Sequence, residues 1–488
     1  MNYGQFLNML PEAYLVGILL LVFFWDFISY RQKSGEAEPS HRQLFNPFMT
    51  LLMAAYVVMC FFVTPSEAFG GMYVSTTAAN VMKIILGLGT LIVVIQSKSW
   101  ITNSSVNGQN GSREGEFYML LVSTLLGMNM MMSSGHFLMF YLGLEMASIP
   151  MACLVALDKY RKNSAEGAAK YILTATFSSG IMLYGISFIY GVCGTLYFDD
   201  VARSLSMELS RPLAIMGLVF FFSGLGFKIS LVPFHFWTAD TYQGAPTSVT
   251  GYLSVVSKGA AAFTLCTILM KVFAAYVDYW QMMLYIVIVL SITVANLFAI
   301  RQNELKRFMA FSSISQAGYI MLAVVGNDGL GITALMFYTL IYVVANLAVF
   351  TVIAAVEERN NGRTDMEAYN GFYQTNPRLA FLLTLALFSL AGIPPFAGMF
   401  SKFFVFMAAA KQGSFAAYFV VFIALINTVV SLYYYLLIVK AMYIKGSNAP
   451  LPTFRSDMNT KLALALCTTG IALFGICSCI YEWIFAAA

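Results

Sequence analysis

Three lysines occur inside apolar stretches of this sequence, where an ionisable side chain is costly to bury. Lys228, Lys258 and Lys402 each lie among Leu, Ile, Val, Phe, Gly and Ala residues. At the centre of a membrane-spanning helix, a lysine costs about 2.5–3.5 kcal/mol. We therefore expect each lysine to face protein or water and to have a polar partner.

One acidic residue, Glu145, is the clearest counterpart, because it also lies within an apolar run. Two interpretations follow: static ion pairs that join helices, or a proton relay. A single clear acid for three lysines favours the relay. A lysine held between burial and a nearby carboxylate can change protonation near neutral pH, because the two influences oppose each other. An arginine cannot do so.

Prolines interrupt two of these apolar stretches. Lys228 precedes Pro233, and Lys402 follows Pro394 and Pro395. Proline removes a backbone donor and breaks a helix, and inside a membrane such breaks persist only where they are buried or line a wet cavity. Interrupted helices in corresponding halves of a chain indicate inverted repeats with ion sites near the membrane midplane.

The third lysine and the nearest histidine complete the predicted site. Lys258 has small neighbours, Ser257, Gly259 and Ala260, which allow close helix packing. His235 follows the first proline break, and the ordinary pKa of histidine, near 6.5, suits a shuttle between lysines. The alternative for His235 is a hydrogen-bonded histidine of the protein core.

The elements that must position these residues are transmembrane helices. The sequence is 59% hydrophobic and only 10% charged, whereas soluble domains have about 25% charged residues. Apolar runs long enough to cross a bilayer recur along the whole length. We predict an all-α polytopic membrane protein of about 14 spans, forming one domain over residues 1–488. Two inverted five-helix repeats, each with a broken helix, are expected at about 117–275 and 279–442, flanked by 1–116 and 443–488.

The remaining basic residues are unevenly distributed among the loops. One set of alternate loops holds most of them, and the other set holds only Lys83, Arg203, Arg211, Lys271 and Lys411. The positive-inside rule places the richer set in the cytoplasm and both termini on the outer side. The run Glu357-Glu358-Arg359 is interpreted as a solvated helix end. No continuous basic stripe indicates a nucleic-acid partner.

Motifs for redox or nucleotide chemistry are absent from the sequence. There is no Gly-rich dinucleotide fingerprint and no phosphate-binding loop. The seven cysteines do not show the paired spacing of a zinc or iron–sulfur site. If the chain serves a redox enzyme, electrons therefore travel through another subunit.

The segment Pro233–Thr247, PFHFWTADTYQGAPT, followed by Lys258, resembles the antiporter-like subunits of respiratory complex I. Phe236, and the segment from Tyr433 to Tyr443, are similar to the subunit N family of bacterial NADH:quinone oxidoreductase, the counterpart of mitochondrial subunit 2. The resemblance covers about residues 116–443. Ala239 departs from it, since the family often has Pro there.

The resemblance implies a role for each residue of the predicted site. Glu145 and Lys228 would form a coupling pair, His235 would bridge to Lys258 as the central proton carrier, and Lys402 would be the terminal site. It also implies that this chain binds no cofactor or metal itself. NADH, FMN, iron–sulfur clusters and quinone would belong to partner subunits, with subunit M and the small subunits A, J and K as neighbours in a bacterial inner membrane.

The function expected from the resemblance is proton translocation coupled to quinone reduction elsewhere in the complex, as a non-redox subunit of a translocase. One alternative is a subunit of a multi-subunit Na⁺/H⁺ antiporter. Another is a structural membrane scaffold whose buried charges only hold neighbouring helices. A ferredoxin- or deazaflavin-linked complex is a further variant with the same subunit.

Overall fold

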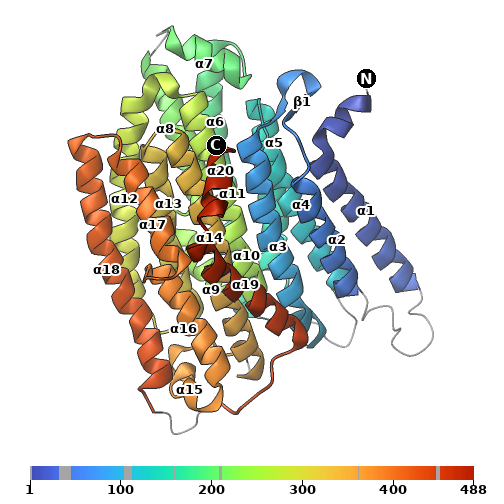
Figure 1. Cartoon of the computed structure of the whole chain (residues 1–488). Helices are drawn as coiled ribbons and strands as arrows, with labels where there is room; N and C mark the ends of the chain where they lie inside the picture. The colour runs from blue at the N-terminus through green and yellow to red at the C-terminus, as the bar shows by residue number, and fades with distance from the viewer. Residues whose placement is uncertain are drawn as a thin grey trace.

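Long helices aligned along one direction form a bundle in the computed structural model (Figure 1). The structure describes residues 3–31, 45–103, 113–158, 161–207, 211–360, 362–446 and 451–488. In this part of the chain, eleven helices are long and apolar enough to cross a membrane. With α2, α4 and the α16–α17 pair alongside them, they account for the predicted number of about 14 spans. The predicted all-α membrane fold is confirmed.

The first half of the chain contains the helices α1 (Leu10–Arg31), α2 (Phe45–Cys60), α3 (Thr77–Asn103), α4 (Glu114–Met132), α5 (Phe137–Val155), α6 (Lys162–Cys193), α7 (Phe198–Ser206), α8 (Arg211–Ile229), α9 (Phe236–Gly244), α10 (Thr247–Tyr252) and α11 (Lys258–Lys271). A short antiparallel hairpin of β1 (Ser66–Ala68) and β2 (Tyr73–Ser75) connects α2 to α3.

The second half contains α12 (Val277–Ile300), α13 (Leu305–Val325), α14 (Gly329–Arg359), α15 (Phe372–Thr375), α16 (Pro377–Ala391), α17 (Ala397–Ala410), α18 (Phe415–Tyr443), α19 (Met458–Ile476) and α20 (Ser478–Phe485). α13 and α14 are almost completely buried and form the centre of the bundle. α1 and α18 lie at opposite edges of the view in Figure 1.

Both proline-containing segments interrupt a helix, as predicted. α8 ends at Ile229, and α9 begins at Phe236. α16 ends at Ala391, where Gly392 has a left-handed conformation with φ = 87°, and α17 begins at Ala397. Glycine adopts this conformation without a steric penalty, so it can end a helix sharply. The last carbonyls of α16 are thereby left without helical partners and can accept other donors.

The same order of elements occurs twice along the chain. α4, α5, α6, the broken pair α8–α9 and the α10–α11 segment are followed by α12, α13, α14, the broken pair α16–α17 and α18. Because each series makes five passes, the second series begins on the opposite side from the first. This order agrees with two inverted repeats, whose boundaries stay a prediction.

The two sets of loops lie at opposite ends of the bundle. The N-terminus, the β1–β2 hairpin and α7 lie at the upper end of Figure 1, and α15 lies at the lower end. The chain enters α19 from the lower end and α20 follows toward the upper end, so both termini lie on the same side. One residue of the upper set was assigned wrongly. Lys83 is completely buried within α3 and does not lie in a loop.

Candidate functional site

Lys228 lies in the last turn of α8, directly before the break, and is 3% exposed. Its Nζ donates to Ser148 Oγ at 2.8 Å and to Tyr171 OH at 3.0 Å. These acceptors come from α5 and α6, so three helices meet at this amine. Both acceptors are neutral, and hydroxyl groups can also donate, so they can satisfy either protonation state of the lysine.

Glu145 precedes Ser148 by one turn of α5 and is half-buried, with Oε1 buried and without a hydrogen-bond partner in the described chain. It interacts electrostatically with Lys228, but the two form no ion pair within 4.0 Å among the described residues. The structure therefore brings the predicted pair together without direct contact. Ser148 occupies the position beside the amine.

Ser148→Ala and Tyr171→Phe are expected to slow proton pumping by about tenfold each, because a hydrogen bond to a charged group contributes roughly 1.5–3 kcal/mol. The measurement is the initial rate of proton uptake into everted membrane vesicles. Ser178→Ala is the matched control, since Ser178 Oγ donates to Gly224 O of α8 and does not contact Lys228. Equal rates in all three variants would contradict a role for Lys228.

Lys258 is the first residue of α11 and is 1% exposed. A π-helical turn, Leu253–Ser257, directly precedes it. Such turns are rare and often lie at functional sites. Lys258 Nζ donates to Ser313 Oγ of α13 at 2.8 Å, and it lies 5.4 Å from the centre of the Tyr242 ring.

Aromatic rings connect Lys228 to Lys258. The Lys228 amine lies 5.7 Å from the centre of the Tyr171 ring. That ring lies 5.1 Å from Trp237, which in turn lies 6.4 Å from Tyr242. An aromatic face attracts a cation at such distances. Thus both lysines contact the same row of three rings, carried by α6 and α9.

His235 occupies the break between α8 and α9, 9% exposed, with its ring stacked on Phe236. Neither lysine donates to it in the described chain, and its Nδ1 is buried without a protein partner. It interacts electrostatically with Lys258. The structure therefore places His235 near the central lysine, and its predicted bridging role remains a prediction.

Lys402, 4% exposed on α17, donates from Nζ to the carbonyl of Ala391 at 2.9 Å. That carbonyl is one of those freed at the end of α16 by the helix break. The amine also lies 5.0 Å from the centre of the Tyr319 ring. A small cavity of about 10 Å³ adjoins Lys402, lined also by Gln316, Tyr338 and Ser401. This is close to the space that one water molecule needs.

Polar side chains of α13 lie beside both Lys258 and Lys402. Ser313 accepts from Lys258, and the neighbouring Ser312 hydroxyl is 2.5 Å from Tyr435 OH. Gln316 donates to Tyr435 at 3.2 Å and accepts from Tyr338, which lines the cavity beside Lys402. The sequence analysis did not identify these residues. The helical spacing of Ser312 and Gln316 in an apolar segment was the available signal.

Two further charges were also misassigned. Lys306, counted with the basic residues of the richer set of loops, is 2% exposed and donates to the carbonyl of Ala245 at 2.7 Å. In the run Glu357-Glu358-Arg359, the last two residues are exposed as predicted, but Glu357 is only partly exposed. It pairs with Arg161 at 2.9 Å, accepts from Thr247 and interacts electrostatically with Lys306. The end of α14 is therefore joined by polar contacts to Arg161 at the start of α6, to α10 and to α13.

A third misassigned charge, Lys83, forms an ion pair with Glu12 at 2.8 Å. Tyr73 OH donates to Glu12 Oε2 at 2.9 Å and accepts from Lys83 at 3.0 Å. This cluster joins α1, α3 and the β1–β2 hairpin. Lys83 differs from Lys228, Lys258 and Lys402 in having a carboxylate in direct contact.

No group of three or more His, Cys, Asp or Glu residues could hold a metal ion in the part of the chain that the structure describes. The ionisable groups that the structure brings together are buried lysine amines with neutral hydrogen-bond acceptors. Three buried lysines, with hydroxyl groups and aromatic rings between them, form a line across the two series of helices.

Comparison with known sequences gives a match over residues 134–431 to a family described as "NADH:quinone oxidoreductase/Mrp antiporter, TM". The chain is 52% identical over 482 residues to NADH-quinone oxidoreductase subunit N of Phocaeicola vulgatus, covering 99% of this chain and 98% of the relative. It is 48% identical over 488 residues to subunit N of Azobacteroides pseudotrichonymphae, with the same two shares covered.

Solved structures agree on the fold. A chain of respiratory complex I from Thermus thermophilus with bound aureothin superposes with a TM-score of 0.80 at 28% identity, covering 98% of this chain and all of that chain. A chain of the Mrp complex from Dietzia superposes with a TM-score of 0.80 at 19% identity, covering 100% of this chain and 97% of that chain. At 19% identity, the second similarity shows the fold alone.

Proposed function

Since the chain belongs to the subunit N family of the NADH-quinone oxidoreductases, we propose that it moves protons through Glu145, Lys228, His235, Lys258 and Lys402. It acts as a membrane-arm subunit of a respiratory complex whose other subunits bind NADH, FMN, iron–sulfur clusters and quinone. Subunit M and the small subunits A, J and K are its expected neighbours. The end rich in basic loops faces the cytoplasm of a bacterial inner membrane, with both termini on the periplasmic side.

One observation supports this proposal most strongly: the acceptors of the three relay lysines. Lys228, Lys258 and Lys402 donate to hydroxyl or carbonyl oxygens, and none is paired with a carboxylate within 4.0 Å in the described chain. A static ion pair would have the geometry of Lys83 and Glu12. Buried lysines without a fixed counter-ion can release a proton at moderate cost, which a relay requires.

Coupling requires two states in which the interaction of Glu145 with Lys228 differs in free energy. The hydroxyl of Ser148 lies against the amine, and Glu145 is one turn away on the same helix. A small shift of α5 along its axis would place a carboxylate oxygen of Glu145 beside the Lys228 amine, where the Ser148 hydroxyl now lies. Proton affinity at Lys228 would change with that shift, and charge would be driven toward Lys258 and Lys402.

Glu145→Gln tests this function in the assembled complex. We expect co-purification with the peripheral iron–sulfur subunits to persist, while NADH-driven proton pumping falls at least tenfold. Glu145→Asp, which retains the charge, should restore part of the rate. Sodium–proton exchange without NADH would instead support the antiporter, and unchanged pumping in Glu145→Gln would support the scaffold.

A further inference from the structure

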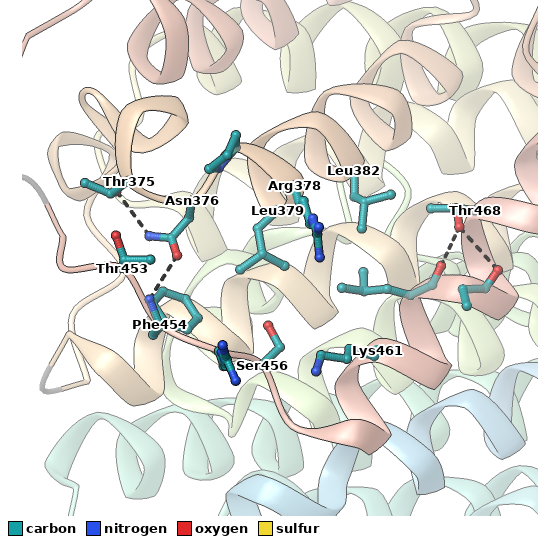
Figure 2. A pocket seen from close by; sticks show the side chains of 14 residues that line it. Thr375, Asn376, Arg378, Leu379, Leu382, Thr453, Phe454, Ser456, Lys461 and Thr468 are labelled. Carbon is teal, nitrogen blue, oxygen red and sulfur yellow. Dashed lines mark hydrogen bonds between the residues drawn. The ribbon is translucent and has the colours of Figure 1, made fainter.

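A pocket of about 690 Å³ lies apart from the lysine line, between α16, α19 and the segment that leads into α19 (Figure 2). Arg378 in the first turn of α16, Lys461 in the first turn of α19, and Arg455 in the connecting segment line the pocket. No carboxylate lines the pocket. Three positive charges therefore converge on one cavity at the end of two apolar helices.

Hydrogen bonds from Asn376 fix the pocket wall. Its Nδ2 donates to the carbonyl of Pro452 at 3.2 Å, and its Oδ1 accepts from the backbone N–H of Phe454 at 3.2 Å. These bonds hold the segment that carries Arg455 against the start of α16, as the dashed line between Asn376 and Phe454 in Figure 2 shows. The pocket is thus a built feature of the fold.

The three cations have no ion-pair partner in the part of the chain that the structure describes. Elsewhere at the same end of the bundle, Arg161 and Arg307 are paired with carboxylates. An unbalanced positive cluster around a cavity attracts an anion, and guanidinium groups match the geometry of phosphate oxygens.

Part of the pocket wall is apolar. Leu379 and Leu382 come from α16, and Leu464 and Ala465 come from α19. On each helix they follow the basic residue within about one turn, so charge gives way to hydrocarbon along the helix axes. A free phosphate would use only the charged part of the wall. A phospholipid would use both parts, with the headgroup at the cations and an acyl chain along the leucines.

We propose that this pocket binds an anionic phospholipid of the membrane, with its phosphate held by Arg378, Arg455 and Lys461. Basic pockets between transmembrane helices bind such headgroups, and each basic residue strengthens binding about fivefold. The lipid would join α19 to the α16–α17 broken helix that carries Lys402, on the outside of the bundle.

The test uses the purified complex, reconstituted into phosphatidylcholine bilayers that contain a photoactivatable phosphatidylglycerol. After illumination, labelled peptides are identified by mass spectrometry. We expect labelling on the start of α16 and α19 in the wild-type complex. Replacing the three cations by Gln (Arg378→Gln, Arg455→Gln, Lys461→Gln) should weaken binding roughly 100-fold and remove most of the label.

Two further variants keep the test decisive. Arg301→Gln, Arg359→Gln and Arg363→Gln together remove three exposed charges that do not line this pocket, so labelling should be unchanged. Ala465→Trp fills the apolar wall without changing charge and should also abolish labelling. The proposal is overturned if the wild-type pocket takes no label, if a protein segment occupies it, if Ala465→Trp is labelled normally, or if millimolar glycerol phosphate displaces the lipid.

Discussion

Membranes that carry Lys258→Met are expected to lose NADH-driven proton pumping completely, with quinone reductase activity reduced at least tenfold. Lys258 is the central member of the line. Three aromatic rings lie between it and Lys228, and α13 supplies polar side chains beside both Lys258 and Lys402. Methionine fills the same space but carries no ionisable group. Proton transfer would therefore stop at this position, and coupled turnover would stop with it. The measurements are proton uptake and NADH oxidation, with assembly checked on native gels.

The variant Lys258→Arg distinguishes between two roles of Lys258, a proton carrier and a fixed structural charge. Arginine keeps the positive charge but does not release its proton in proteins, so we expect it to be as inactive as methionine. Lys271→Met is the matched control on the same helix, because Lys271 is exposed and pairs with Asp199 at the bundle end. If Lys258→Arg pumped normally, the charge of Lys258 would be structural and the relay would be wrong.

The second large effect concerns stability and the cluster around Lys83. Lys83→Met leaves Glu12 buried without a counter-ion, which costs about 3–5 kcal/mol. We expect a clear fall in the thermal stability and yield of the assembled complex. The assembled fraction should pump at the normal rate per complex, because this cluster lies outside the line of relay lysines. Thermal inactivation and pumping are measured on the same preparations.

The double variant Glu12→Leu with Lys83→Met should recover most of the lost stability, because replacing both members of a buried ion pair by apolar residues is often neutral. Lys411→Met is the control for an exposed pair. It removes the contact of Lys411 with Asp328 at 2.7 Å, and it should cost less than about 1 kcal/mol. If Lys83→Met assembled stably but pumped poorly, Lys83 would belong to the proton path.

The class of fold and the burial of Lys228, Lys258 and Lys402 were predictable from the sequence, because both depend on local composition. A charge deep in an apolar run of about 20 residues cannot reach water at either membrane surface. Prolines identify helix breaks for a similarly local reason, since the missing N–H and the ring clash act within one turn. The breaks observed at Ile229–Phe236 and Ala391–Ala397 follow from these residues.

Charges near the ends of spans could not be assigned in this way. Lys83, Lys306 and Glu357 all lie within a few residues of a helix end, where a long side chain can turn toward water or toward the protein. The sequence is the same in either case. The side chain turns toward the protein only if another helix supplies a partner there. For Glu357 those partners, Thr247 and Arg161, are more than 100 positions away in the chain.

By itself, the sequence determined that this protein spans a membrane, where its helices break and which lysines are buried far from water. Only the tertiary structure decided what those lysines touch. Ser148 lies beside Lys228 in place of Glu145, and Ser313 and the carbonyl of Ala391 accept from Lys258 and Lys402. Helix registers and rotations set such contacts, and these depend on packing across the whole bundle because each helix is positioned by all of its neighbours.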